Sequence, residues 1–199
     1  KDEVLMRTVI DISKWNKGIN FDLLKPNGVY GVIVRIGCGM TRDPMYATFV
    51  SMLKKRKIPW GVYLYSMATT PDKARKEASQ LVSMLSGQHP QLGVWLDIED
   101  DSQFKSGMDT TAIASAFIVK CNQVGYNCGI YTSRGKCSNS LKNSIRPNAL
   151  ASYVKYWIAE YNSTCRFKSL FPSRTLAGWQ YTDKKYIGTV KTDFSHWYE

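Results

Sequence analysis

The sequence of 199 residues contains only two histidines, and this scarcity limits the chemistry that it can support. His89 stands beside a loop and His196 near the C-terminus, so a Ser-His-Asp or Cys-His arrangement would depend on a single candidate base. The five cysteines form no C-x-x-C motif, which disfavours a structural zinc site. The phosphate-binding patterns G-x-x-x-x-G-K-[ST] and G-x-G-x-x-G are also missing, which disfavours a nucleotide-binding protein.

Long apolar runs are missing as well. No stretch approaches the roughly 18 uninterrupted apolar residues that a membrane span needs, and the N-terminal "KDEVLMRTVIDIS" lacks the apolar core of a signal peptide. We therefore expect a soluble protein with no membrane partner. The length fits one domain of ordinary size, and we expect a single domain over residues 1–199.

Acidic residues are few relative to basic ones, and the formal net charge is +11. Such a charge favours a polyanionic partner, which could be a nucleic acid, an anionic glycan or a bacterial wall. The basic clusters at 54–57 and 72–77 fall on segments with helical patterns, where a solvated helix face is the more ordinary interpretation. Cys121 with Cys128, or Cys137 with Cys165, could form disulfides in an oxidising compartment, and the sequence leaves this open.

Short apolar, β-branched runs recur along the chain with helical patterns between them. Eight segments read as strands: 8–13, 31–37, 60–66, 93–99, 128–133, 156–161, 176–182 and 188–194. Strands that alternate with helices favour right-handed βαβ units and a parallel sheet, and eight strands favour a closed barrel. Little room for helices remains after residue 156. We therefore predict an α/β fold, an irregular TIM-type barrel of eight strands with fewer helices, the helices being missing in the last third.

Three segments carry helical patterns. The first starts near Asp43 and keeps Tyr46, Val50 and Leu53 on one face. The second, over 70–87, has Thr70 as N-cap, Pro71 at the first helical position and Gly87 as its stop, with an apolar stripe of Ala74, Ala78, Leu81, Val82 and Leu85. The third, over 109–125, should turn Ile113, Phe117, Cys121 and Val124 inward.

The run "VWLDIE" ends a core strand with two carboxylates. Alternation places Val94, Leu96 and Ile98 on one face and Trp95, Asp97 and Glu99 on the other, which in a barrel points inward near the carboxyl-end mouth. Two carboxylates in such a place repel one another and lose hydration, so the pKa of one should rise, as a general acid requires. Asp11 ends the first strand and Asp193 the last, so a closed barrel gathers Asp11, Asp97, Glu99 and Asp193 at one mouth.

Aromatic and amide side chains surround these acids in the expected barrel. They are Tyr63 and Tyr65 on the third strand, Trp157 and Tyr161 on the sixth, and Trp179 with Gln180 at the end of the seventh. Acids ringed by aromatics describe a sugar-binding cleft, and we expect these rings to stack on pyranose faces. An oxygen-ligand metal site at the acids is the rival interpretation, and no histidine supports it.

The motifs at these strand ends resemble glycoside hydrolase family 25, the Chalaropsis-type lysozymes. "DISKWNKGINFDLLK" is similar to the family's opening D-[VI]-S-x-W-Q-G, and "GVIVRIGCG" to its second strand with a barrel arginine, here Arg35. "LDIED" carries the D-x-E signature, "YWIAEY" resembles the [LY]-W-x-A-x-Y strand, and "WQYT" with "GTVKTDFSHW" resembles the closing segment. Asn16 stands where glutamine is usual and Leu64 where histidine is common.

The resemblance implies cleavage of the β-1,4 bond between N-acetylmuramic acid and N-acetylglucosamine in peptidoglycan, with no metal or cofactor. Glu99 becomes the general acid, Asp97 an orienting and electrostatic support, and Asp11 and Asp193 the rest of the acidic pocket. Retention through the substrate's own N-acetyl group is the favoured mechanism. A catalytically weak wall-binding module is the alternative, although it would not need the acids. A nucleic-acid partner is disfavoured because an acidic mouth repels phosphate.

The resemblance also implies where the protein acts. We expect a monomer that acts outside the cell or at the cell wall, with peptidoglycan as its partner and anionic wall polymers attracted by the positive charge. A phage lysin, an autolysin and a secreted lysozyme all fit these expectations.

Overall fold

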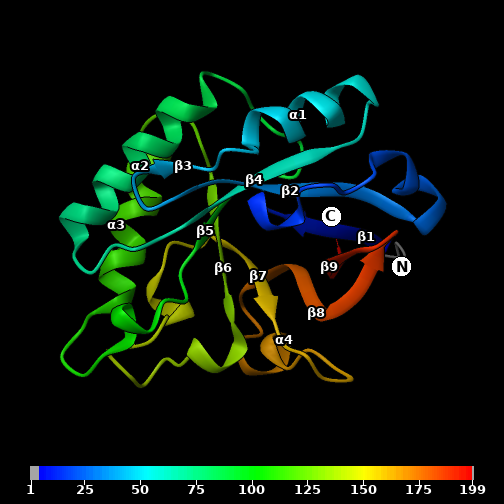
Figure 1. Cartoon of the computed structure of the whole chain (residues 1–199). Helices are drawn as coiled ribbons and strands as arrows, with labels where there is room; N and C mark the ends of the chain where they lie inside the picture. The colour runs from blue at the N-terminus through cyan, green and yellow to red at the C-terminus, as the bar shows by residue number, and fades with distance from the viewer. Residues whose placement is uncertain (1–4, 199) are drawn as a thin grey trace.

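Eight strands of the computed structural model, which describes residues 5–198, wind into a closed barrel (Figure 1). A ninth strand, β3, has two residues and pairs only with the end of β2. The strands are β1 (Arg7–Ile12), β2 (Val29–Cys38), β3 (Thr41–Arg42), β4 (Trp60–Tyr65), β5 (Val94–Asp97), β6 (Cys128–Ser133), β7 (Lys155–Ala159), β8 (Thr175–Ile187) and β9 (Val190–Trp197). The predicted eight-stranded α/β barrel is confirmed.

The barrel closes through β1, which pairs with β2 on one side and with β9 on the other. Neighbouring strands from β1 round to β8 are parallel, whereas β9 is antiparallel to both β8 and β1. The reason is the connection: Ile187 pairs with Val190 across Gly188, which has a positive φ of 60°. Two residues can form only a hairpin, because a parallel crossover needs a dozen or more. Asp193 therefore lies inside a strand that runs against its neighbours.

The helices are α1 (Tyr46–Lys55), α2 (Pro71–Leu85), α3 (Thr110–Asn122) and α4 (Phe167–Leu170). Helices α1, α2 and α3 pack outside strands β2, β5 and β6, and the short α4 lies apart from them beside β8 (Figure 1). The Thr70 hydroxyl caps α2 by accepting from the Lys73 N–H at 3.3 Å, as predicted. Only the four residues of α4 are α-helical in the described part of the last third, which agrees with the expected loss of helices there. None of the helices in residues 5–198 has the length and apolar character needed to cross a membrane.

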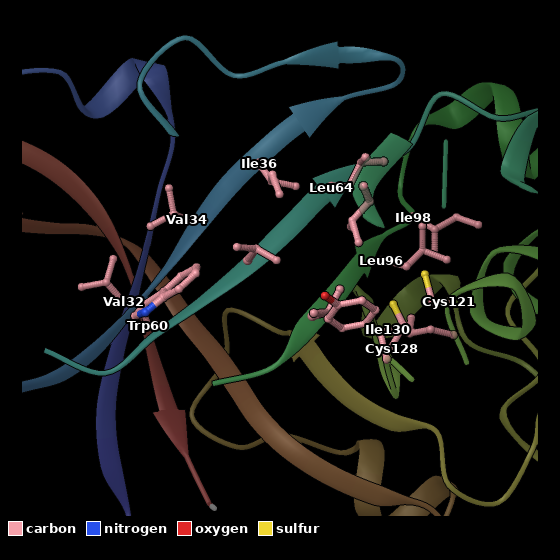
Figure 2. Close-up of a cluster of buried hydrophobic side chains, with 14 of the residues drawn as sticks. Val32, Val34, Ile36, Trp60, Leu64, Leu96, Ile98, Cys121, Cys128 and Ile130 are labelled. Carbon is pink, nitrogen blue, oxygen red and sulfur yellow. The ribbon is translucent and has the colours of Figure 1, made fainter. Parts of the chain in front are cut away.

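Two apolar layers form on the two faces of the sheet. The outer layer, shown in part in Figure 2, packs Val34, Leu96 and Ile98 against the helices. The thiols of Cys121 and Cys128 lie side by side in this layer, and all five cysteines are free. The inner layer fills the barrel with Val9, Ile33, Leu92, Trp95, Tyr131, Trp157, Ala177 and Trp197.

Glycines make room for the indoles inside the barrel. A Cβ atom on Gly129 would lie 2.4 Å from a ring carbon of Trp95, and one on Gly178 would lie 2.4 Å from the ring of Trp197. The barrel interior is therefore a packed core and not a pore. One expectation for the outer layer is wrong: Val124 lies beyond the end of α3 and is exposed, because the helix stops at Asn122.

Candidate active site

Two adjoining cavities open at the mouth of the barrel where the parallel strands end. The smaller, of about 210 Å³, is lined by Asp11, Ser13, Trp15, Arg35, Tyr63, Tyr65, Asp97, Glu99, Tyr131, Trp157 and Asp193. The larger, of about 470 Å³, is lined by Glu99, Tyr131, Ser133, Ala159, Tyr161, Asp183 and Asp193. Glu99, Tyr131 and Asp193 line both, so the two cavities adjoin at these residues and are together called the cleft below.

The fold brings the four predicted acids together at the cleft. Asp11 on β1 faces Asp193 on β9 in direct register, and Asp97 ends β5 with Glu99 two residues further on. All four line the smaller cavity. The alternation predicted for 94–99 holds, because Trp95 and Asp97 turn into the barrel while Leu96 and Ile98 face the helices.

Burial raises the pKa of every member of this cluster. The pKa of Asp97 lies well above its usual value because the side chain is buried and because Glu99 and Asp11 add negative charge, against the opposing cations Arg35 and Lys136. Burial is also the main cause of the raised pKa of Asp11, with the charge of Asp193 next. The pKa of Asp193 rises to about 6 through burial and the charge of Asp183.

Glu99 has a raised pKa for a related reason. Burial is the main cause, Asp193, Asp100 and Asp101 raise it further, and Lys136 lowers it. The sequence led us to expect one raised carboxyl and one ordinary one. The structure instead raises the pKa of all four acids, because all four are withdrawn from water in one place.

Hydrogen bonds on both sides fix the backbone that carries Glu99. The Ile98 N–H donates to Tyr131 O at 3.0 Å, and the Thr132 hydroxyl donates to Ile98 O at 2.7 Å. On the other side, the Lys136 ammonium donates to Glu99 O and pairs with Asp101 at 2.9 Å. Glu99 therefore projects from a segment that β6 and the Lys136 loop hold in place.

Asp100 and Asp101, which follow Glu99, stabilise the loop around it. Asp100 caps the 3₁₀ helix Asp101–Phe104 by accepting from the Ser102 N–H at 3.0 Å, and the Asp100 N–H donates to Gln103 Oε1 at 3.2 Å. The Ser102 hydroxyl also donates to Asp100 Oδ1, and this bond, together with the bond from the Ser102 N–H, lowers the pKa of Asp100. Gln103 also donates to Ser66 Oγ and Ala68 O, which joins this turn to the segment after β4. The flanking carboxylates of "LDIEDD" thus shape the loop that presents Glu99.

Gln180 connects three groups of the site. Its Nε2 donates to Asp11 Oδ2 at 2.9 Å, while its Oε1 accepts from the hydroxyls of Tyr131 and Tyr161, each at 2.8 Å. The bond to Asp11 lowers the pKa of that acid against the effect of burial. Gln180 is itself buried, so it positions these groups and does not line either cavity.

Arg35 closes another side of the cleft. Its Nε pairs with Asp43 Oδ2 at 2.7 Å, and the same oxygen accepts from the Lys14 N–H at 3.1 Å. Asp43 thereby ties the 3₁₀ helix Lys14–Asn16 to β2. Arg35 lines the smaller cavity and opposes the negative charge near Asp97.

The predicted aromatic residues separate into two groups. Tyr63 and Tyr65 line the smaller cavity and Tyr161 the larger. Trp157 touches the smaller cavity but is 1% exposed, and its indole N–H donates to Ser195 Oγ at 3.0 Å. It belongs to the barrel core, so the expectation that it stacks on a sugar is not supported by its position.

Trp179 lies outside the cleft. Its indole N–H donates to Glu160 O at 2.7 Å, its ring contacts Tyr181 and His196, and it lines a different cavity beside Cys165. Strand alternation explains this, because neighbours on a strand point to opposite faces and Gln180 points inward.

Trp15, Tyr131 and Lys136 were missed by the sequence analysis. Trp15 lies on the 3₁₀ helix Lys14–Asn16, is 78% exposed at the edge of the smaller cavity and has the Lys14 ammonium 4.7 Å from its ring. Its place four residues after Asp11 in the opening motif is a signal that could have identified it. No sequence motif identifies Lys136, because it lies far from Glu99 in the sequence and only the fold brings the two together.

A sequence profile decides the family. The profile of the glycosyl hydrolases family 25 matches residues 10–190. The chain belongs to glycosyl hydrolase family 25. Comparison with curated proteins gives no match.

Solved structures of this family share the fold. The modular autolysin LytC of Streptococcus pneumoniae is 27% identical with a TM-score of 0.82, and the match covers 97% of this chain and 47% of LytC. The chain thus spans about half the length of that autolysin. The catalytic domain of endolysin ply40 from the Listeria monocytogenes bacteriophage P40 is 25% identical with a TM-score of 0.75, over 96% of this chain and 93% of that domain. Within residues 5–198 no group of three or more His, Cys, Asp or Glu is arranged to hold a metal ion.

Proposed function

We propose that this family 25 chain is a peptidoglycan hydrolase that cleaves the β-1,4 bond between N-acetylmuramic acid and N-acetylglucosamine. The observation that carries the proposal is the cluster of four withdrawn carboxyl groups at the barrel mouth, each with a raised pKa. The similar autolysin LytC has been solved in complex with a synthetic peptidoglycan ligand, at 27% identity to this chain. The described barrel acts as one catalytic unit in this proposal.

Glu99 acts as the general acid. Burial and the charge of Asp193 raise its pKa, so a larger share of its carboxyl groups carries a proton near neutral pH than in an exposed glutamate. The proton passes to the glycosidic oxygen as the bond to the anomeric carbon breaks. The backbone bonds to β6 and Lys136 keep the carboxyl in one place during this step.

Asp97 supports the reacting sugar. Its Oδ1 is buried and has no hydrogen-bond partner in the described part of the chain, although Asp97 lines the smaller cavity. An unsatisfied buried oxygen is costly unless a partner arrives, and the acetamido group of an N-acetyl sugar is such a partner. We assign Asp97 to orient that group for attack on the anomeric carbon, which is a known exception to the two-carboxylate scheme and retains configuration.

The remaining residues of the site hold the glycan. Asp11 and Asp193 place negative charge next to the positive charge that develops on the ring, and Gln180 fixes Asp11. Tyr63, Tyr65 and Tyr161 offer rings or hydroxyls to the sugars, and Arg35 balances the acids. In this proposal the protein acts as a monomer on bacterial walls, as an autolysin, a secreted lysozyme or a phage lysin.

Mass spectrometry of peptidoglycan digested by the protein tests this function. Muropeptides that end in reducing N-acetylmuramic acid are the expected products. Reducing-end N-acetylglucosamine would make the protein a glucosaminidase, and a product cut between glycan and peptide would make it an amidase. Binding without any new reducing end would instead support a wall-binding module.

A further inference from the structure

The charges of this protein are divided between two surfaces. Most described acids away from the cleft are either paired with an arginine or buried; the exceptions are Asp101, which pairs with Lys136, and Asp100, which caps the 3₁₀ helix Asp101–Phe104. The paired acids are Asp22 with Arg56, Asp43 with Arg35, Asp72 with Arg75, Asp109 with Arg146 and Glu160 with Arg166, and the buried one is Glu77. Since the chain as a whole carries a net charge of +11 and the mouth is acidic, the excess of positive charge lies on surfaces other than the mouth.

A groove on one flank concentrates this positive charge. It has a volume of about 860 Å³ and runs between α2 and α3, which lie side by side in Figure 1. Arg75, Lys76 and Lys120 line it together with hydrogen-bonding side chains such as Gln80 and Ser115. Among residues 5–198, no acidic and no aromatic residue lines it. It shares no residue with the cleft.

Two of the three cations in the groove are available for an external anion. Lys76 and Lys120 form no ion pair with any residue between 5 and 198. Arg75 pairs with Asp72 at 2.6 Å, and both side chains are largely exposed, so this pair is weak and easily exchanged. Ammonium and guanidinium groups beside hydroxyl and amide donors match the oxygens of a phosphodiester.

We propose that the α2–α3 groove binds a linear phosphodiester polymer of the bacterial cell wall. The proposal rests on the proposed function, which makes the wall the surface on which the protein acts. Charge complementarity selects the groove and rejects the cleft, since the acids of the cleft repel phosphate. A nucleic acid offers the same phosphates, but the groove lacks the aromatic rings on which unpaired bases stack. The polymer thus docks on the flank and leaves the cleft free for the glycan strand.

A pair of triple variants with equal charge change tests this site. The groove variant carries Arg75→Gln, Lys76→Gln and Lys120→Gln. The control variant carries Lys25→Gln, Lys55→Gln and Lys57→Gln, three exposed lysines that line neither the groove nor the cleft. Glutamine has nearly the helix propensity of lysine and arginine, so α2 and α3 should persist. Thermal melts of both variants check this.

The first measurement is sedimentation of each protein with purified walls, at low and at high salt. Two wall preparations are compared: one keeps its phosphodiester polymer, and the other has been stripped of it by hydrofluoric acid. We expect the groove variant to bind intact walls about ten-fold more weakly than the wild type at low salt, since several phosphate contacts are lost, and the control variant to bind nearly as the wild type. Stripped walls should bind all three proteins equally. Equal losses in both variants, no loss in either, or unchanged binding of the wild type to stripped walls would overturn the proposal.

Two further measurements distinguish a failure of the groove proposal from a failure of the proposed function. Competition by purified wall polymer should release the protein from walls more effectively than single-stranded DNA of equal phosphate concentration, and the reverse order would overturn the assignment of the polymer. Turnover of soluble peptidoglycan fragments that carry no phosphodiester polymer reports the cleft alone and should be equal in the three proteins. If none of them cleaves while only the groove variant loses binding, the proposed function fails and the groove assignment stands.

Discussion

Replacing Asp193 with asparagine should stabilise the folded protein at neutral pH. The pKa of Asp193 is raised from 3.8 to about 6, mainly by burial and then by the charge of Asp183. A raised carboxyl pKa means that the folded state holds its proton more firmly than the unfolded chain. The contribution of Asp193 to the free energy of unfolding is therefore full below about pH 4 and is lost as the pH rises through about 6. Above that pH the folded protein keeps an unfavourable charge that asparagine would remove.

The size of the effect follows from this rise in pKa. A change from 3.8 to about 6 corresponds to about 3 kcal/mol. Asp193 is partly exposed, and solvent screening reduces the figure, so we expect the Asp193→Asn variant to gain about 1–2 kcal/mol of unfolding free energy at pH 7. At pH 4 the gain should be much smaller, because the carboxyl is then almost fully protonated in the folded state and partly protonated in the unfolded chain.

Urea denaturation of the wild type and the variant at pH values between 4 and 8 measures this difference. Asp22→Asn is the matched control, because the hydrogen bond from Arg56 lowers the pKa of Asp22 and reverses the sign: any loss should appear above pH 4. An Asp193→Asn protein that is no more stable than the wild type at pH 7, or that shows the same gain at pH 4, would refute the reasoning. Since Asp193 also raises the pKa of Glu99, the alkaline limb of the cleavage profile should move to lower pH in this variant.

Three other substitutions address separate parts of the cleft. Lys136→Met should move the alkaline limb of the pH–rate profile to higher pH, because Lys136 lowers the pKa of Glu99; an unmoved limb contradicts this. Gln180→Met removes three hydrogen bonds, two of them buried, and should lower the free energy of unfolding by about 2–4 kcal/mol in urea denaturation, against about 1 kcal/mol for Tyr161→Phe; equal losses would show that Gln180 does not connect the three groups. Trp15→Ala should raise KM for polymeric glycan without changing Tm, since this ring is exposed, and an unchanged KM removes Trp15 from the substrate site.

Local patterns were sufficient to predict much of the fold. Apolar β-branched runs marked the eight barrel strands, and the period of two in 94–99 separated Asp97 and Glu99 from the residues that face the helices. Thr70 and Pro71 located the start of α2, because capping and proline geometry act within a few residues. These features depend on neighbours in sequence, which is why they could be predicted without the structure.

Features that depend on distant residues were predicted less well. The direction of β9 follows from a two-residue turn after an unexpectedly long β8, and the predicted end of the strand at 182 concealed that turn. Trp179 was assigned to the cleft although Gln180 beside it must point to the opposite face. The proton affinity of Glu99 depends on Lys136 and Asp193, which only the closed barrel brings close.

The central claim is that Glu99 supplies the proton that breaks the glycosidic bond. Turnover of soluble wall fragments by Glu99→Gln, measured beside a thermal melt, tests it most directly. Glutamine keeps the shape of the side chain and cannot release a proton, so turnover should fall by roughly 10² to 10⁴. The melting temperature should stay the same or rise slightly, because a charge withdrawn from water is removed. A Glu99→Gln protein that melts normally and cleaves at nearly the wild-type rate would contradict the account.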